Sequence, residues 1–351
     1  MYLYEQPDWP CFRFDRARLT ERLSTVRHQQ GRIVGRMEGL GFLLQQDANL
    51  QALTEDVLKT SEIEGEVLDH SQVRSSLARQ LGIDIGGLRP ADRHVEGIVE
   101  MILDATRNYA APLTAERLFG WQAALFPTGY SRLYPIQTGA WRQDVTGPMQ
   151  VVSGAVGREH VHFEAPPAQR LDAEMAAFLD GFNAGPDIDP VLQAGLAHLW
   201  FVTLHPFEDG NGRIARAIGD MALARSELTG QRFYSLSAQI REERNDYYEI
   251  RERTQKGTLD VTAWMEWFLG CLGRALARSE ATVTGVLTKS RLWTAVATVP
   301  LNERQRAVLA RVIDGENKWE GKLTTSKWAK LAKCSQDTAH RDIISLVNQG
   351  F

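Results

Sequence analysis

A twelve-residue run from His205 to Arg216 constrains this chain more than any other feature, because it places a tight glycine turn directly before a helix. Gly210, Asn211 and Gly212 form the turn, and the residues from Arg213 onward have a helical pattern. The first N–H groups of such a helix have no partners within it and carry the positive end of the helix dipole. The run therefore predicts an anion-binding site.

Side chains in the same run supply the groups that phosphate chemistry needs. Arg213 and Arg216 stand three residues apart, so they share a helix face and are predicted to hold one polyphosphate. Asp209 is a candidate magnesium ligand, since Mg²⁺ is held by one or two carboxylates together with phosphate oxygens. His205 is a candidate general base, because an imidazole accepts protons near neutral pH.

Two other nucleotide-binding motifs compete with this interpretation. The stretch from Gly210 to Ala215 formally matches the dinucleotide fingerprint GxGxxG/A, but it lacks the βαβ context and the second strand with an acidic ribose contact. The sequence contains no GxxxxGK(S/T), which excludes a P-loop. His160 and His198 stand outside the run, and we interpret them as structural residues.

Apolar spacing elsewhere predicts an all-α fold with one exception. Leu19, Leu23 and Val26 lie on one face of a helix over 16–30. Thr54 is expected to cap a helix that ends at Gly65. Further helices are predicted over 113–126, 170–182, 191–203 and 262–276. The exception is 149–167, which is typical of two short strands around a glycine-containing loop or, alternatively, of a decorated surface loop.

The composition predicts a soluble chain with no global attraction to nucleic acid or membrane. The 351 residues include 40 basic and 44 acidic side chains, a net charge of −4. Cys11, Cys271 and Cys334 lie far apart, which argues against a disulfide framework and suits a reducing compartment. The N-terminus lacks the pattern of a signal peptide, and no segment is apolar enough to cross a bilayer. We expect a cytoplasmic protein.

The run from His205 to Arg216 matches HPFx(D/E)GNGRxxR at every specified position, and the chain therefore resembles the Fic family. The resemblance implies transfer of AMP from ATP to a Ser, Thr or Tyr hydroxyl of a target protein, with Mg²⁺. His205 would be the general base and Asp209 the metal ligand. Asn211, with the amides of Gly210 and Gly212, would bind the α-phosphate, and Arg213 and Arg216 would hold the outer phosphates. Phosphate transfer, as in a kinase-like branch of the family, is the alternative.

The same resemblance implies roles for two other segments. The hairpin over 149–163 would be a flap that pairs with the backbone of the target, as in β-strand addition. Tyr247 is the candidate for the adenosine pocket, although two adjacent tyrosines are as typical of a core.

Residues 60–65 match the inhibitory pattern (S/T)xxxE(G/N) of the family. Glu64 stands in the last turn of its helix, where the dipole disfavours a carboxylate and a basic partner is expected. We expect Glu64 to pair with Arg216 and to deny that arginine to the γ-phosphate. In the family the same glutamate also supports removal of AMP.

We predict three sections: a helical region with the inhibitory helix over 1–90, a catalytic core over 91–280, and a linker with a helix-turn-helix over 281–351. The last resembles a winged-helix DNA-binding domain, with helices over 324–332 and 336–348. Five basic residues against Asp337 and Asp342 after position 321 favour DNA binding through 302–351. A nucleotide-sensing transcriptional regulator is therefore the alternative function, and a homodimer is expected from the family alone.

Overall fold

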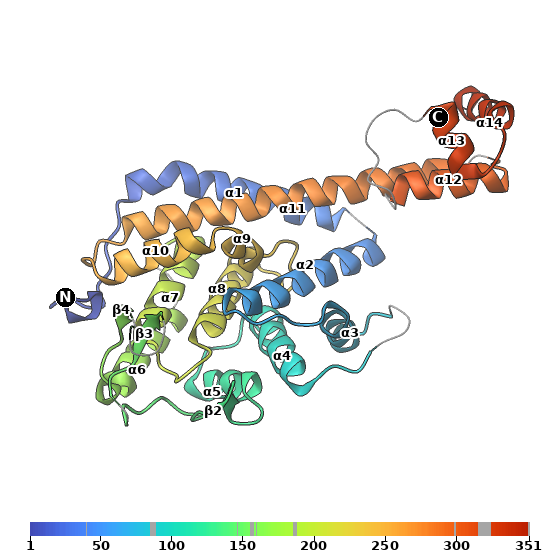
Figure 1. Ribbon diagram of the computed structural model, residues 1–351. Coiled ribbons are helices and arrows are strands. Elements are labelled where there is room, and N and C mark those ends of the chain that lie inside the picture. The colour runs from blue at the N-terminus through green and yellow to red at the C-terminus, as the bar shows by residue number, and fades with distance from the viewer. Residues whose placement is uncertain are drawn as a thin grey trace. The chain divides into compact units, whose positions relative to one another are not determined.

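A computed structural model describes residues 1–39, 41–84, 89–145, 147–154, 158, 160–184, 188–297, 300–314 and 324–349. Among these residues, helices dominate and the strands form two small antiparallel hairpins (Figure 1). The predicted mainly helical fold is therefore confirmed. The chain divides into one unit from Met1 to Ser279 and a second from Glu280 to Phe351. Helix α11 (Thr262–Ala297) runs through the boundary, where the sequence pattern predicts a connection.

The first unit contains most of the helices and strands that the structure describes. Its helices are η1 (Leu3–Glu5), α1 (Arg16–Glu38), α2 (Phe42–Ile63), α3 (His70–Leu81), α4 (Arg93–Arg107), α5 (Ala115–Leu125), η2 (Ala168–Arg170), α6 (Leu171–Asn183), α7 (Pro190–Leu204), α8 (Asn211–Glu227), α9 (Leu236–Glu242) and α10 (Arg244–Gln255), followed by the first part of α11. Its strands are β1 (Tyr130–Ser131), β2 (Tyr134–Pro135), β3 (Gln150–Ser153) and β4 (His160–Glu164).

Helices α7 and α8 pack along each other at the centre of the first unit, with α6 against α7 and α2, α4 and α5 against α8 (Figure 1). Leu199, Phe201 and Leu204 of α7 are fully buried, and so are Ile214 and Ile218 of α8. A helix that is apolar on all sides belongs in a core. The run from His205 to Arg216, the predicted catalytic run, joins these two helices, so it is held by the part of the unit where the helices pack most extensively.

Helix α2 is longer than its sequence predicts. It begins at Phe42, so the prediction that Thr54 caps it is wrong. The Thr54 hydroxyl instead donates to the carbonyl of Leu50 at 2.6 Å, inside the helix. The C-terminal prediction is correct, since the helix stops at Ile63 and Gly65 has the left-handed φ of +83°. Glu64 is thereby placed at the helix end that points toward α8.

The predicted hairpin is present as the antiparallel pair β3–β4, with Val151 opposite Phe163 and an irregularity after Val151. Residues 155–157 and 159 of its connection lie outside the described residues. Phe163 is buried against the N-terminal segment, where its ring meets Tyr2 edge-on at 5.1 Å and Tyr4 at 6.2 Å. The first residues of the chain therefore support the hairpin from behind.

The second unit contains α12 (Glu303–Asp314), α13 (Thr325–Ala332) and α14 (Gln336–Asn348) around the buried side chains of Val308, Trp328 and Leu346. Ser335 caps α14 by accepting from the N–H of Thr338 at 3.2 Å. The described residues of this unit include no strand, and the winged-helix interpretation stays a prediction.

Candidate active site

His205 lies at the point where α7 ends and the loop over 205–210 begins, which is named the catalytic loop after its predicted role. Its backbone has the left-handed φ of +48°, which is uncommon for a residue with a side chain and is concentrated at functional sites. The ring Nδ1 lies 3.2 Å from the carbonyl of Val202, which fixes the proton on that nitrogen. Nε2 is left with its lone pair. Burial lowers the pKa of His205 to about 4, so the ring is neutral at pH 7 and able to accept a proton.

The loop after His205 is shaped by Asn211 and Gly210. The side chain of Asn211 accepts from the N–H of Phe207 at 3.0 Å and donates to its carbonyl at 2.8 Å, which closes the loop. Gly210 adopts a φ of +91°, a conformation that favours glycine. Helix α8 then starts at Asn211, so the N–H groups of its first turn, including that of Gly212, have no carbonyl one turn earlier. The predicted anion site thus has backbone donors, while the Asn211 amide maintains the loop.

Asp209 is held beside this helix start by two donors. Oδ1 accepts from the N–H of Gly210 at 2.6 Å, and Oδ2 accepts from the hydroxyl of Ser131. Asp209 lines the cleft described below together with His205 and Gly212. Each carboxylate oxygen keeps a further lone pair, and a hard oxygen donor of this kind fits a Mg²⁺ ion that also binds phosphate.

Both predicted phosphate-binding arginines are buried and face carboxylates from the end of α2. Arg216 donates from Nε to the hydroxyl of Thr60 at 2.7 Å and from Nη2 to Glu64 at 2.7 Å. Its Nη1 is buried and has no hydrogen-bond partner among the described residues, which suits a donor that awaits a ligand. Arg213 donates to Glu66 at 3.1 Å and lies over the ring of Phe126 at 5.0 Å.

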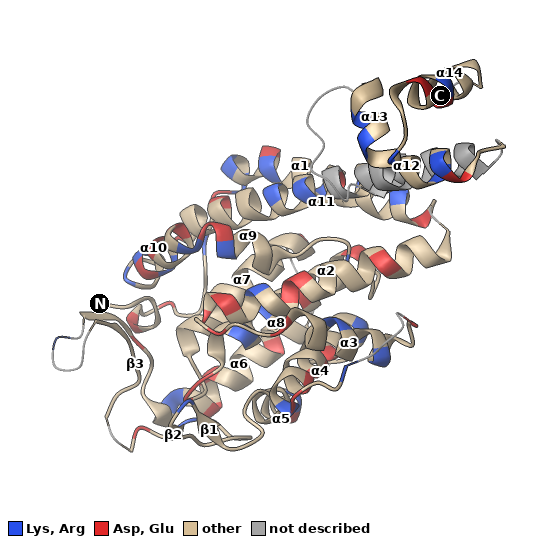
Figure 2. Cartoon of the chain, turned by 45° about the vertical axis from the view of Figure 1, so that its right-hand side comes forward, with Lys and Arg blue, Asp and Glu red and all other residues tan. Residues whose placement is uncertain are grey.

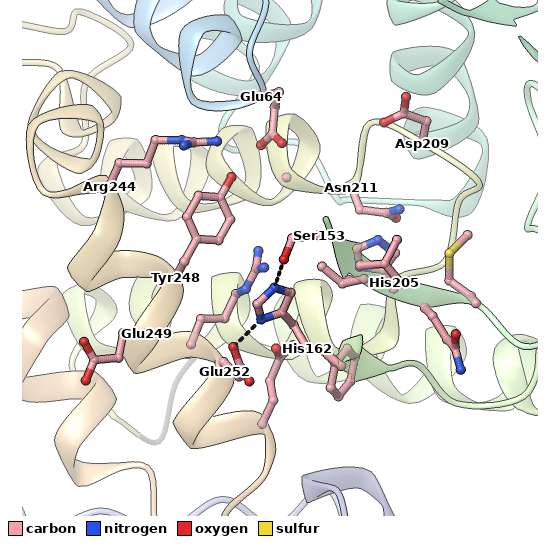
Figure 3. Close-up of a pocket in the computed structure, with 18 of the residues that line it drawn as sticks. Glu64, Ser153, His162, His205, Asp209, Asn211, Arg244, Tyr248, Glu249 and Glu252 are labelled. Carbon is pink, nitrogen blue, oxygen red and sulfur yellow. Dashed lines mark hydrogen bonds and ion pairs between the residues drawn. The ribbon is translucent and has the colours of Figure 1, made fainter. Parts of the chain in front are cut away.

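Glu64 covers the start of α8 (Figure 3). A Cβ on Gly212 would lie 2.2 Å from Oε1 of Glu64, so only a glycine lets the carboxylate approach the backbone so closely. Burial acts to raise the pKa of Glu64, but the charge and hydrogen bond of Arg216 outweigh it, and the net shift is downward. The carboxylate is therefore ionised, and it occupies the space above the amides of the helix start.

These groups open onto a cleft of about 650 Å³ between the hairpin, α10 and the catalytic loop. Glu64, His205, Asp209 and Gly212 line it from the loop side, and Tyr248 lines it from α10 (Figure 3). A second cavity of about 770 Å³ shares Glu64 and Asp209 and extends toward Glu66 and Arg213. The imidazole of His205, the amides at the start of α8 and the carboxylate of Asp209 therefore line the same cleft.

Comparison with known proteins decides the family. A model of the Fic/DOC family matches residues 112–223, which include the hairpins, α7 and the catalytic run. Residues 112–223 of the chain are a Fic domain. A second model, a domain of unknown function (DUF4172), matches residues 2–83, which include α1 and the Glu64 helix.

Curated relatives are similar to part of the chain. The protein adenylyltransferase Fic of Nematostella vectensis is 32% identical over 124 residues, which are 34% of this chain and 27% of that protein. The uridine 5'-monophosphate transferase of Xanthomonas campestris pv. campestris (strain 8004) is 32% identical over 126 residues, which are 34% of this chain and 22% of that protein. The match thus spans about a quarter of the length of these relatives.

Among solved structures, a Fic family protein from Desulfovibrio desulfuricans G20 is similar to 92% of this chain and 87% of its own, with a TM-score of 0.55 and 20% identity. This similarity shows a shared Fic fold. In the part of the chain that the structure describes, no helix is long and apolar enough to cross a membrane.

One site residue of the Fic core needs correction. Tyr247 was predicted to bind adenosine, but its side chain is fully buried, and its hydroxyl lies 2.9 Å from Nε2 of His198. Tyr248, the next residue, lines the cleft instead, with the guanidinium groups of Arg244 and Arg251 at 4.9 and 4.8 Å from its ring centre. The core alternative therefore holds for Tyr247.

Sequence reasoning also missed Arg142, a buried residue that holds the catalytic loop. Its Nε donates to the carbonyl of His205 at 2.8 Å, Nη2 donates to the carbonyl of Pro166 at 2.5 Å, and Nη1 pairs with Asp144. A single arginine in a loop carries no pattern that reveals such partners. The Arg142 guanidinium thus connects the backbone of His205 to that of Pro166, which follows β4.

Proposed function

We propose that this Fic family protein is a nucleotidyltransferase that moves AMP from ATP to a Ser, Thr or Tyr hydroxyl of a protein target. The proposal rests chiefly on one observation. The unprotonated Nε2 of His205, the free amides at the start of α8 and the Asp209 carboxylate meet in one cleft. A neutral base beside an anion site is what attack by a hydroxyl on a phosphate ester requires.

In this reaction the acceptor hydroxyl attacks the α-phosphorus, a new P–O bond forms and pyrophosphate leaves. Nε2 of His205 takes the hydroxyl proton. The amides of the first turn of α8, with that of Gly212, hold the α-phosphate oxygens, and Arg213 and Arg216 hold the outer phosphates. Mg²⁺ bound to Asp209 would neutralise part of the phosphate charge.

Autoinhibition by Glu64 is part of this proposal. The Glu64 carboxylate occupies Arg216 and lies against Gly212, where a phosphate of ATP would otherwise be placed. ATP would then bind with its γ-phosphate away from Arg216, and the α-phosphorus would not be in line with the hydroxyl. The same carboxylate, close to the cleft, could orient a water for removal of AMP.

Glu66 adds a second carboxylate to this arrangement. It accepts a hydrogen bond from Arg213 at 3.1 Å, and its Oε1 lies 2.5 Å from Nε2 of His94. Burial raises the pKa of Glu66, but His94 and Arg213 lower it more, so the group is ionised. The segment after α2 therefore engages both phosphate-binding arginines, and its displacement would free them together.

Incubation with Mg²⁺ and ATP labelled at the α- or the γ-phosphate tests the proposed function. Transfer of α-label to protein, lost in His205→Ala, supports nucleotidyl transfer, whereas transfer of γ-label would indicate the kinase-like reaction. α-Labelled UTP, run in parallel, distinguishes AMP from UMP as the group moved. The absence of any transfer in Glu64→Gly, with candidate hydroxyl peptides present, would contradict the proposal.

The target would dock on β3 of the hairpin. Val152 on this strand is 49% exposed, and Val151 and Val152 line the cleft beside His205. An extended peptide that pairs with this strand would bring its hydroxyl side chain over the cleft. Substitution of Val152 by proline would remove a backbone donor and is expected to reduce transfer to a target without reducing ATP binding.

DNA binding by the second unit is a separate proposal, favoured by its helix-turn-helix. Lys327, Lys330 and Lys333 are exposed on or directly after α13, and His340 and Arg341 are exposed on α14. Figure 2 shows basic residues, drawn in blue, on α13. A mobility shift of the full chain on duplex DNA at low salt, weakened by Arg341→Ala, would support a regulator. The absence of a shift at micromolar protein would contradict it.

A further inference from the structure

Beyond the catalytic loop, the described residues hold one group of three side chains with the composition of a transition-metal site. His160 and His162 lie on β4, and Glu252 lies on α10. One ligand atom from each falls within 4.8 Å of the other two. Residues two apart on a strand point to the same face, which is why both imidazoles meet the same helix.

His162 is already oriented as a metal ligand. Its Nδ1 lies 2.6 Å from Oε2 of Glu252, and its Nε2 lies 2.6 Å from the hydroxyl of Ser153 on β3 (Figure 3). Metal-binding histidines commonly use one ring nitrogen for the ion and fix the ring through a hydrogen bond at the other. A serine hydroxyl both donates and accepts, so Ser153 supports the ring in either tautomer.

Glu252 is prepared in the same way. Lys256 donates to its Oε1 at 2.6 Å, which leaves Oε2 directed at His162. Burial acts to raise the pKa of Glu252, but the hydrogen bonds from Lys256 and His162 outweigh it, so the pKa is lowered. The group is therefore a carboxylate at neutral pH. Two imidazoles with one such carboxylate match the ligand sets of zinc sites that keep an open position.

The His160 side chain lies close to that of His162. The rings of His160 and His162 are 4.6 Å apart between centres and nearly perpendicular. His160 is exposed, so an ion has an entry path from solvent. A ligand separation of up to 4.8 Å needs only a small side-chain movement to meet the metal–ligand bonds of about 2 Å typical of zinc.

We propose that His160, His162 and Glu252 bind a Zn²⁺-class divalent ion, which joins the β3–β4 hairpin to α10. Binding replaces the proton on Nδ1 of His162 with the metal and releases that proton to solvent. Imidazole ligands favour Zn²⁺ over Mg²⁺, so this site is distinct from the Asp209 carboxylate. The proposal does not depend on nucleotide transfer. Because His162 and Glu252 also line the cleft, the ion would hold the hairpin at one position beside the catalytic loop.

Titration of the full chain with Zn²⁺ in excess Mg²⁺, followed by calorimetry, tests this site. The wild type is expected to bind one equivalent saturably. His160→Ala, which lacks a ligand, is expected to lose at least as much affinity as a variant that lacks a supporting residue, roughly 100-fold. Ser153→Ala is expected to weaken binding about tenfold, as loss of a supporting hydrogen bond does. His340→Ala, which removes an exposed histidine from α14, serves as the matched control and is expected to bind like the wild type.

Co²⁺ titration gives a second measurement, because a four-coordinate site with nitrogen ligands produces visible absorption bands that His160→Ala and Glu252→Gln should lose. Thermal unfolding in EDTA is the check that both variants are folded. Equal zinc affinity in His160→Ala and the wild type would overturn the proposal, since the ion would then be bound elsewhere. A lack of saturable zinc binding by the wild type would also overturn it, and the three side chains would then only link β4 to α10 through hydrogen bonds.

Discussion

The carboxylate of Glu64 accepts a 2.7 Å hydrogen bond from Nη2 of Arg216, a residue 152 positions later in the chain. The pair joins the end of α2 to the first turns of α8. Arg216 is only 2% exposed, and its guanidinium also donates to the hydroxyl and carbonyl of Thr60. A buried guanidinium with this many partners is fixed in place, with the Glu64 carboxylate as its anionic partner.

Replacing Glu64 with glycine is expected to raise the rate of α-label transfer about 10- to 100-fold. A hydrogen bond to a charged group contributes about 1.5–3 kcal/mol, and each 1.4 kcal/mol is a factor of ten. The variant loses the carboxylate on Arg216 and the contact over Gly212 together. Initial rates of self-labelling at saturating ATP measure the effect.

Glu62→Ala is the control for this variant, because Glu62 lies on the same helix but pairs with Lys59 at 2.8 Å and Arg241 at 3.5 Å. Its rate is expected to stay near that of the wild type. If both variants gain activity equally, destabilisation of α2, and not the Glu64–Arg216 pair, explains the gain.

Arg142→Lys is expected to reduce the transfer rate about tenfold or more while the affinity for ATP changes little. Lysine keeps the charge but cannot donate simultaneously to the carbonyls of His205 and Pro166. His205 would then lose its fixed position, and a base displaced by a fraction of an ångström is less effective. Nucleotide binding by calorimetry and label transfer, measured on the same sample, separate the two effects. A large loss of ATP affinity would contradict this positioning role.

The catalytic run was predictable because its residues are contiguous. One stretch of sequence contains the loop, the candidate base, the anion site and the arginines. A glycine turn directly before a helix predicts an anion site at the helix start. The partners of that stretch are not contiguous. Arg142 acts through the backbone carbonyls of His205 and Pro166, and any residue type supplies a carbonyl, so no sequence pattern marks the contact.

The error at Tyr247 has a different cause. On α10, Tyr247 shares a face with Ile250 and Thr254, which are both buried, whereas Tyr248 is turned one position around the helix toward the cleft. The helical spacing of buried residues distinguishes Tyr247 from Tyr248, whereas the two side chains have the same chemistry. Thr54 failed for a related reason: the start of α2 at Gly41 has no side-chain cap, and so no residue signalled it.

Gly97→Ala is expected to destabilise the first unit by about 3 kcal/mol. A Cβ at this position of α4 would lie 1.8 Å from the carbonyl oxygen of Ala124 on α5, and a backbone atom of a packed helix cannot move aside cheaply. Gly120→Ala on α5 is the matched control, since nothing lies within 4 Å of its added Cβ. Helix propensity alone should then stabilise the control by about 1 kcal/mol. Urea unfolding compares the two, and equal stabilities would contradict the close crossing of α4 and α5.

The stability of the first unit is expected to fall as the pH drops below about 6.5, with His198 as a main cause. His198 is 1% exposed on α7, and burial lowers its pKa to about 3, with Arg216 and Arg251 adding to the shift. Between these two pH values His198 is protonated in the unfolded chain but stays neutral in the folded chain. Unfolding is thus favoured as the pH falls, by up to about 1.4 kcal/mol per pH unit for one such group.

This pH dependence is measured by urea unfolding at intervals from pH 7 to pH 4. His198→Gln is expected to be less stable at pH 7, because the contact of His198 with the Tyr247 hydroxyl is lost, but its stability should fall less steeply on acidification. His205, whose pKa is lowered in the same direction, continues to contribute in the variant. His28→Gln, at an exposed position of α1, is the control and should keep the wild-type slope. A buried neutral imidazole takes up a proton when the protein unfolds. If His198→Gln keeps the wild-type dependence of stability on pH, that proton is taken up by another group.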